Sequence, residues 1–421
     1  MTSSAALNLA QAARYGLMGL PLAFVALPLY VLLPNHYARA FGVPLATLGA
    51  LLLATRLLDA LIDPLLGRWS DRLFRRSAGA LLAWAGIACG IMALGFALLF
   101  FPPLTEGAGL LVVAAVLLVL TYAAFSAVTL AHQSWGALLG AEALVQSRLV
   151  AWREGLGLVG VLLASVVPVA LGLPVMVGLF SLALGVGWLA WRSGPRPPSV
   201  AAADEAQPVK VWLPWQRGPF RRLLAVFMLN GIASAVPATL VLFFVQDRLQ
   251  APAAQEPVFL GSYFLAAALS MPLWLRAVRA WGLARSWLLG MALAVAVFVW
   301  ATTLGAGDST PFIAICVLSG AALGADLVMP GAMLAGLIGR AGDLGRAQGA
   351  YYGWWAFATK LNLALAAGLA LPLLGFFGYS PGTREPQALQ ALTYAYCLLP
   401  CVLKLAAGGL LFQFFVRKGS S

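Results

Sequence analysis

Long apolar stretches recur along almost the whole chain, and only short polar segments separate them. Each stretch is close to 20 residues or longer, which is the length that an α-helix needs to cross the hydrocarbon core of a bilayer. The strands of a membrane barrel are about half as long and alternate between apolar and polar residues, so the pattern favours helices. We predict twelve membrane-spanning helices, over residues 12–33, 44–66, 79–101, 108–138, 146–170, 173–193, 220–245, 257–277, 283–305, 310–338, 346–376 and 390–415.

Composition leads to the same class of protein. Of the 421 residues, 62% are hydrophobic and only 10% are charged, which excludes a soluble globular domain. No basic segment precedes the first apolar stretch, so we expect the first helix to stay uncleaved. We expect no soluble catalytic domain beside the helices.

The formal net charge is +12, and the basic residues gather in alternate loops. This is the positive-inside pattern of a membrane protein, and it predicts that both termini face the cytoplasm. Nucleic acid is therefore not an expected partner. The loops predicted to be cytoplasmic carry Arg68, Arg72, Arg75, Arg76, Arg192, Arg196, Lys210, Arg217, Arg221, Arg222, Arg276, Arg279, Arg285, Arg340, Arg346, Arg417 and Lys418.

The chain divides into two similar halves. Between the sixth and seventh predicted helices, residues 193–218 are the least apolar segment and read as a cytoplasmic linker. Pro28 precedes Arg39 by eleven residues, and Pro237 precedes Arg248 by eleven in the second half. A spacing that recurs in both halves of a chain is typical of duplicated transporters, whose halves rock about a central site. We predict an N-terminal six-helix bundle over 1–193, a linker over 194–218 and a C-terminal six-helix bundle over 219–421.

A charged triplet interrupts the second predicted helix. Arg56, Asp59 and Asp63 are spaced by four residues or fewer, so they share one helix face. Charge inside a membrane span is costly, which makes a functional role the default hypothesis. The triplet has a formal charge of minus one, so one sodium ion or one proton would neutralise it. The alternative is that the acids pair with a nearby basic residue and only hold helices together.

Residues 67–76 follow this helix and read G-R-W-S-D-R-L-F-R-R. The segment resembles the signature G-x-x-x-D-R-x-x-R-R of the major facilitator superfamily, whose fold is two six-helix bundles. The resemblance implies that the charges clasp neighbouring helix ends and gate closure. On this basis gating or structural roles are expected for Arg56, Asp71, Arg72, Arg75 and Arg76.

Three further segments, 56–67, 147–154 and 351–360, resemble the glycoside-pentoside-hexuronide cation symporters, the family of melibiose permease. The resemblance implies that Asp59, Asp63 and Thr129 bind the coupling cation, and that Arg153 and Lys360 bind the solute. At the family's two sugar-binding aspartates this chain has Ala23 and His132, which argues against galactoside as the solute.

Two residues keep two interpretations, and a third has no assigned role. His132 is either a packing residue or a solute contact or proton relay, because an imidazole titrates near neutral pH. Trp135 is assigned to the solute site, although aromatic residues in such helices are often packing anchors. Asp326 is a second acid within a predicted span and stays unassigned.

The expected protein is an all-α secondary transporter of twelve helices that moves a small organic solute, such as a sugar or glycoside, with Na⁺ or H⁺ by alternating access. A lipid or lysolipid carrier of the same fold is the alternative. A membrane enzyme or scaffold is less favoured, because no nucleophile and base are paired. We expect a monomer in the cytoplasmic membrane, with solute and membrane lipid as partners and no cofactor or metal beyond the coupling ion. Substrate, ion and direction of transport stay open.

Overall fold

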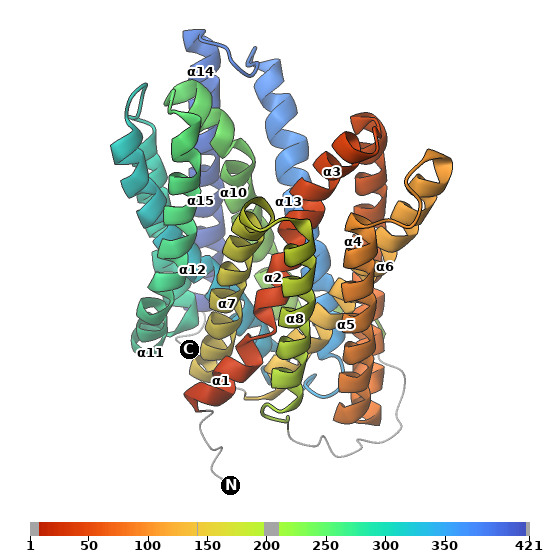
Figure 1. Cartoon of the computed structure of the whole chain (residues 1–421). Helices are drawn as coiled ribbons and strands as arrows, with labels where there is room; N and C mark the ends of the chain where they lie inside the picture. Colours follow the sequence, from red (N-terminus) through yellow and green to blue (C-terminus); the bar gives the residue numbers. More distant parts are fainter. Residues whose placement is uncertain (1–7, 141, 198–209, 418–421) are drawn as a thin grey trace. The chain divides into compact units, whose positions relative to one another are not determined.

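A computed structural model describes residues 8–140, 142–197 and 210–417 (Figure 1). All regular secondary structure in these residues is helical, as the apolar pattern predicts. The chain forms two compact units, Met1–Gln216 with Ile338–Phe357, and Arg217–Leu337 with Ala358–Ser421. The predicted linker lies partly outside the described residues, and the division into two six-helix bundles stays a prediction.

The first unit begins with a helix that is interrupted twice. Its parts are α1 (Leu9–Gly16), α2 (Gly19–Leu27), a π-helical turn η1 (Pro28–Leu32) and α3 (Leu33–Ala40). Pro28 has no backbone N–H and begins the π turn, which is a usual cause of a local change in helix geometry. The helices α4 (Leu45–Arg76), α5 (Ala78–Phe100), α6 (Gly107–Leu138), α7 (Ala143–Ala170), α8 (Leu173–Arg192) and the short α9 (Leu213–Gln216) follow.

Residues 67–76, predicted as a loop, instead continue α4 as helix up to Arg76. Arginine and leucine are good helix formers, and they make up half of this extension. The break comes at Ser77, whose side-chain oxygen accepts a hydrogen bond from the Ala80 N–H at 2.9 Å and so caps α5.

The second unit contains α10 (Gly218–Phe243) with the π turn η2 (Phe244–Arg248), a 3₁₀ turn η3 (Ala253–Gln255) and α11 (Glu256–Ala301). The next two helices, α12 (Ser309–Arg340) and α13 (Gln348–Phe376), each have one end in the first unit. The final span consists of α14 (Pro386–Thr393), η4 (Tyr394–Leu398), α15 (Leu399–Leu411) and η5 (Phe412–Val416).

The helix α11 holds two of the predicted spans. Gly282 has a φ of 78° inside it, a conformation that glycine adopts without steric cost, and the chain bends there. Nine helical stretches among the described residues are long and apolar enough to cross a membrane. With α4, α13 and the two parts of α11 counted separately, each of the twelve predicted spans corresponds to a helix.

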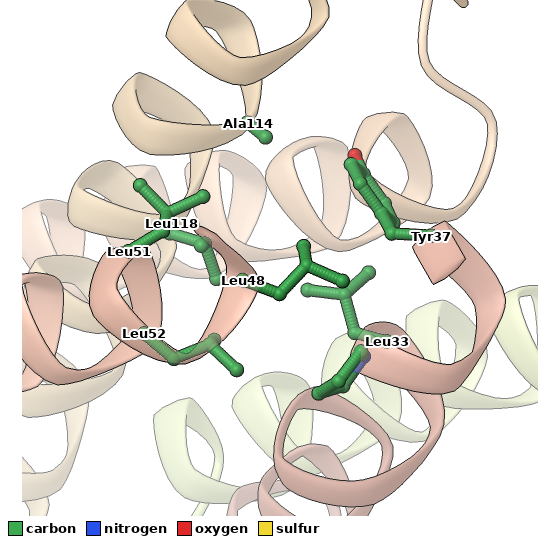
Figure 2. Close-up of a pocket in the computed structure, with 8 residues that line it drawn as sticks. Leu33, Tyr37, Leu48, Leu51, Leu52, Ala114 and Leu118 are labelled. Atoms are coloured by element: carbon green, nitrogen blue, oxygen red, sulfur yellow. The ribbon is translucent and has the colours of Figure 1, made fainter. Parts of the chain in front are cut away.

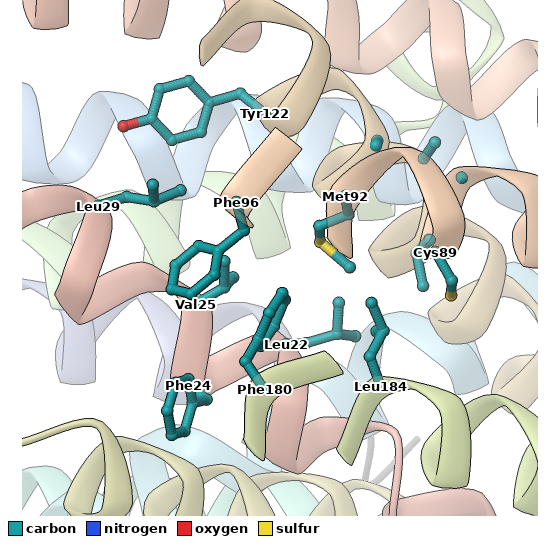
Figure 3. Packing of buried hydrophobic residues seen from close by; sticks show 14 of the residues in the cluster. Leu22, Phe24, Val25, Leu29, Cys89, Met92, Phe96, Tyr122, Phe180 and Leu184 are labelled. Atoms are coloured by element: carbon teal, nitrogen blue, oxygen red, sulfur yellow. The ribbon is translucent and has the colours of Figure 1, made fainter. Parts of the chain in front are cut away.

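Each unit has its own hydrophobic core. In the first, side chains from α2, α5 and α8 meet, and the Phe96 and Phe180 rings lie 4.5 Å apart (Figure 3). In the second, Phe244 stacks on Tyr396 at 4.2 Å. Close packing of these side chains holds the polar groups described next in defined positions.

Candidate functional site

The charged triplet lies on one face of α4, as its spacing predicts. Asp59 and Asp63 are buried, with exposed fractions of 6% and 0%. The Ser126 hydroxyl of α6 donates a hydrogen bond to Asp59 Oδ1 at 2.8 Å. Two carboxylates are thus held within the helix packing of the first unit, where ionisation is costly without a compensating charge.

Arg56 supplies one compensating charge. Its guanidinium lies 3.0 Å from the centre of the Tyr30 ring, in a cation–π contact. The Tyr122 hydroxyl and Asp59 are also within its electrostatic reach. We call Arg56, Asp59, Asp63, Tyr122 and Ser126 the α4 cluster. Among these five side chains, two are acidic and one is basic.

Thr129, predicted as a cation ligand, lies one helical turn after Ser126 on α6. Its Oγ1 atom is buried and has no hydrogen-bond partner in the described part of the chain. Ser126 is the hydroxyl that contacts Asp59. It was not predicted, because one serine in an apolar helix carries no special signal. Residues 126 and 129 share a helix face, so Thr129 keeps its place as a predicted ligand.

Arg153 of α7 is paired with its own neighbour. Its Nη2 lies 2.5 Å from Glu154 Oε1 and its Nε donates to the same oxygen at 3.0 Å. Tyr15 and Tyr352 lie within electrostatic reach of its guanidinium. The side chain of Arg153 is 14% exposed, so a solute carboxylate or hydroxyl reaching it would meet a guanidinium already held in place by Glu154.

His132 is completely buried. Its Nε2 is 2.9 Å from the Tyr15 carbonyl oxygen, and its ring stacks on the Tyr15 ring at 4.1 Å. The Tyr15 hydroxyl in turn donates to the His132 carbonyl oxygen at 3.1 Å, and Trp191 packs edge-on at 5.0 Å. These reciprocal contacts favour the packing interpretation that the sequence left open.

Trp135 is 1% exposed and donates its indole N–H to the Pro195 carbonyl oxygen at 3.0 Å. Its ring packs edge-on against Phe74 and Trp191. The side chain therefore joins the end of α6 to the segment after α8. These contacts favour the interpretation of Trp135 as a packing residue. Lys360, the other predicted solute residue, is half-buried on the part of α13 that belongs to the second unit.

Asp71, predicted as a gating residue, accepts two hydrogen bonds from the first turn of α13. The Gly349 N–H donates to Oδ1 at 2.6 Å and the Ala350 N–H to Oδ2 at 3.0 Å. The Ala350 N–H also donates to the Ala347 carbonyl oxygen at 3.0 Å. A helix N-terminus attracts negative charge. Asp71 lies beyond the predicted span 44–66. Burial raises its pKa to about 8, while the two N–H groups and Arg75 act in the opposite direction.

Two glycines allow this contact. A Cβ atom on Gly67 would lie 2.0 Å from the Gly349 carbonyl oxygen, and one on Gly349 would lie 2.1 Å from the Gly67 carbonyl oxygen. The backbones of α4 and α13 therefore touch directly. Arg72, Arg75 and Arg76 are exposed on the same end of α4.

The second unit has a buried ion pair that was not predicted from the sequence. Lys404 Nζ lies 2.7 Å from Asp326 Oδ2 and donates to Asn230 Oδ1 at 2.8 Å and to Ser234 Oγ at 3.1 Å. The Trp287 indole N–H donates to Asp326 Oδ1 at 2.8 Å. Lys404 is 4% exposed. The sequence did contain one indication of this pair, because Lys404 lies within the last apolar stretch. An ionisable residue in a membrane span usually has a role in function or in folding.

A small pocket in the first unit is too small for a solute. It has a volume of about 10 Å³ and is lined by apolar side chains and Tyr37 from α3, α4 and α6 (Figure 2). Such a space holds one water molecule at most. It is a packing defect beside the core.

Comparison with known families decides the class of protein. A family model described as MFS/sugar transport protein matches residues 12–190 and 213–417. The chain belongs to this family. It is therefore a multi-pass membrane transporter with the major facilitator fold, as the loop signature and the twelve spans predict.

Individual relatives of this MFS/sugar transport protein are distant. An uncharacterized symporter of Bacillus subtilis (strain 168), YjmB, is 23% identical over 406 residues, which are 88% of this chain and 84% of that protein. A putative glycoside/cation symporter of Escherichia coli (strain K12), YagG, is 29% identical over 153 residues, 36% of this chain and 33% of that one. A crystal structure of a bacterial homologue of the iron transporter ferroportin, in an outward-facing state with soaked iron, has a TM-score of 0.71 at 15% identity. The match covers 97% of this chain and 99% of that one.

Membership of a sugar transport family makes the lipid-carrier alternative less favoured. The structural likeness shows the fold alone.

Substituting Gly67 with alanine in this family member is expected to lower the free energy of unfolding by about 1 to 3 kcal/mol, because the added methyl group collides with the α13 backbone. Gly49, on the same helix, is the matched control, since a Cβ there meets no atom within 4 Å. Thermal unfolding in detergent would compare Gly67→Ala with Gly49→Ala. Equal midpoints for the two variants would contradict the close backbone contact.

Proposed function

We propose that this chain is a symporter that couples the movement of a small organic solute, such as a sugar or a glycoside, to Na⁺ or H⁺ by alternating access. One observation carries the proposal. In the α4 cluster, Asp59 and Asp63 are buried inside the helix packing, on the face of α4 that carries Arg56. The printed description of the YagG relative, a putative glycoside/cation symporter, supports the same class of transport.

The physical basis of coupling is charge balance. The triplet Arg56, Asp59 and Asp63 has a formal charge of minus one, and buried negative charge is costly to move through a low-dielectric bundle. One Na⁺ or one proton removes that charge and lowers the cost of reorientation. Two carboxylates with the Ser126 or Thr129 hydroxyl are the hard oxygen donors that Na⁺ prefers, while either carboxylate is able to hold a proton instead.

On the solute side we propose Arg153 and Lys360 as binding residues. Both are basic and incompletely buried, and each would attract hydroxyl or carboxylate oxygens of the solute. We assign His132 and Trp135 to packing, on the contacts described above. Asp71 is proposed as a gate residue that releases the N-terminus of α13 when the transporter changes state.

We also propose that the protein is a monomer in the cytoplasmic membrane, with both termini in the cytoplasm, and that it acts as a transporter and catalyses no covalent chemistry. The distribution of basic residues over alternate loops supports this orientation.

A thermal-shift titration of the purified protein tests the coupling site, with NaCl against choline chloride at several pH values. A ligand that binds only the folded state raises the unfolding midpoint. Stabilisation by Na⁺ that disappears in Asp59→Asn supports sodium coupling. A pH-dependent shift that disappears in the same variant supports proton coupling. The exposed loop acid in Glu106→Gln is the control and should change neither response. Independence from both Na⁺ and pH would sink the coupling proposal.

A further inference from the structure

A groove runs between α5 and α8 on the surface of the first unit, and its volume is about 720 Å³. Cys89 and Leu184, which are labelled in Figure 3, are among its lining residues. Ile87 also lines it and is 65% exposed, so the groove opens on the outside of the helix pair. This α5–α8 groove is separate from the α4 cluster.

Glycines create the space in the groove. A Cβ atom placed on Gly90 of α5 or on Gly185 of α8 would meet no atom within 4 Å. Deeper in the pair, a Cβ on Gly86 would lie 2.9 Å from the Trp188 indole. That indole donates its N–H to the Leu82 carbonyl oxygen at 3.2 Å and so joins α8 to α5. The groove is therefore a preformed feature of two helices that are tied together.

One end of the groove is basic. Arg192, the last residue of α8, and Arg196 both line it, and no acidic residue is among the lining residues that the structure describes. The Arg192 guanidinium lies 5.4 Å above the Trp188 ring. Gly79, in the first turn of α5, lines the groove too. The basic end therefore lies near the start of α5, next to the arginine-rich end of α4, and by our proposed orientation it faces the cytoplasm.

The length of the groove fits one leaflet of a bilayer. It follows α5 from Gly79 to Ala93, which is about 21 Å at the helical rise per residue. Half of the hydrocarbon core of a bilayer is about 15 Å thick, and the polar headgroup region lies beyond it. The groove thus spans one headgroup and one layer of acyl chain.

We propose that the α5–α8 groove binds one anionic phospholipid of the cytoplasmic leaflet. Its phosphate contacts Arg192 and Arg196, and an acyl chain lies along the open space at Gly90 and Gly185. Guanidinium groups bind phosphate oxygens in pairs of hydrogen bonds, and basic pockets between membrane helices on the cytoplasmic side bind acidic headgroups. The lipid is a resident ligand that joins α5 to α8, and it is distinct from the transported solute.

The test uses the full-length protein, purified in mild detergent and depleted of lipid. Dioleoyl phosphatidylglycerol and dioleoyl phosphatidylcholine, which have the same acyl chains, are titrated separately and binding is followed by native mass spectrometry. We expect phosphatidylglycerol to bind at least about tenfold more tightly than phosphatidylcholine, and Arg192→Gln or Arg196→Gln each to weaken its binding about fivefold. Both arginines are exposed, so these variants should fold.

Matched variants separate the groove from general attraction to a basic surface. Gly90→Leu and Gly185→Leu fill the groove and should lower phosphatidylglycerol affinity at least about fivefold. Gly178→Leu, on α8 at another position with open space, and Arg279→Gln, an exposed arginine of the second unit, should leave it unchanged. Equal binding of the two lipids by the unmodified protein would overturn the proposal. Loss of selectivity in the arginine variants with full binding in both leucine variants would overturn it as well, because the groove would then hold no lipid.

Discussion

Replacing Lys404 with methionine is expected to lower the free energy of unfolding by about 3 to 5 kcal/mol, because the change leaves Asp326 buried without its cation. Lys404 also donates to Asn230 and Ser234, so three acceptors lose a donor at once. Methionine has a similar length and adds no strain. Thermal unfolding of the purified protein and its yield in the membrane fraction would both show the loss.

A double variant distinguishes a lost ion pair from a lost packing contact. Lys404→Met with Asp326→Asn removes both charges, and an asparagine can still accept the Trp287 indole N–H. We expect the double variant to recover at least half of the lost stability, since a neutral pair is often tolerated where a single charge is not. Lys210→Met, at an exposed position, is the control. A double variant as unstable as Lys404→Met would contradict the charge-pair interpretation.

The second large effect is expected at Asp59. Asp59→Asn removes one of the two carboxylates of the α4 cluster, so the electrostatic attraction for a bound cation becomes weaker. At an effective dielectric constant near 20, one unit charge at about 4 Å contributes roughly 4 kcal/mol, so we expect cation affinity to fall at least about a hundredfold. Electrical recording on proteoliposomes after a Na⁺ or pH jump measures cation binding without knowledge of the solute.

The sign of the effect reverses at Arg56. Arg56→Gln removes the compensating charge from the same cluster, so cation binding should tighten where Asp59→Asn weakens it. Glu106→Gln should leave the charge movement unchanged, because that carboxylate is exposed in a loop. Charge movements of normal size in Asp59→Asn would show that Asp59 is structural and that coupling uses another group.

Much of the fold follows from local properties of the chain. A bilayer requires each span to satisfy its own backbone hydrogen bonds, so the length of each apolar stretch predicts a helix independently of the others. Local rules also explain why the predicted loop 67–76 was wrong in detail. The extension of α4 has good helix propensity, and the break is set by Ser77, which caps the next helix.

Whether a candidate site could be predicted depended on how far apart its residues lie in the sequence. Asp59 and Asp63 lie within one turn of a helix, so their common face was predictable from spacing. Glu154 was missed although it neighbours Arg153, because adjacent residues on a helix do not normally face each other. Here the long arginine side chain folds back on the glutamate. His132 was ambiguous in sequence, and the stacked Tyr15 ring favours packing.

By itself the sequence determined the class of protein, the number and approximate limits of the helices, and the face of α4 that carries charge. These features depend on interactions within one helix or between a helix and the bilayer. Only the tertiary structure decided which hydroxyl contacts Asp59, which helix end Asp71 binds and which cation neutralises Asp326. Those pairs come from different helices, and their meeting depends on helix packing, which a pattern along a single chain does not encode locally.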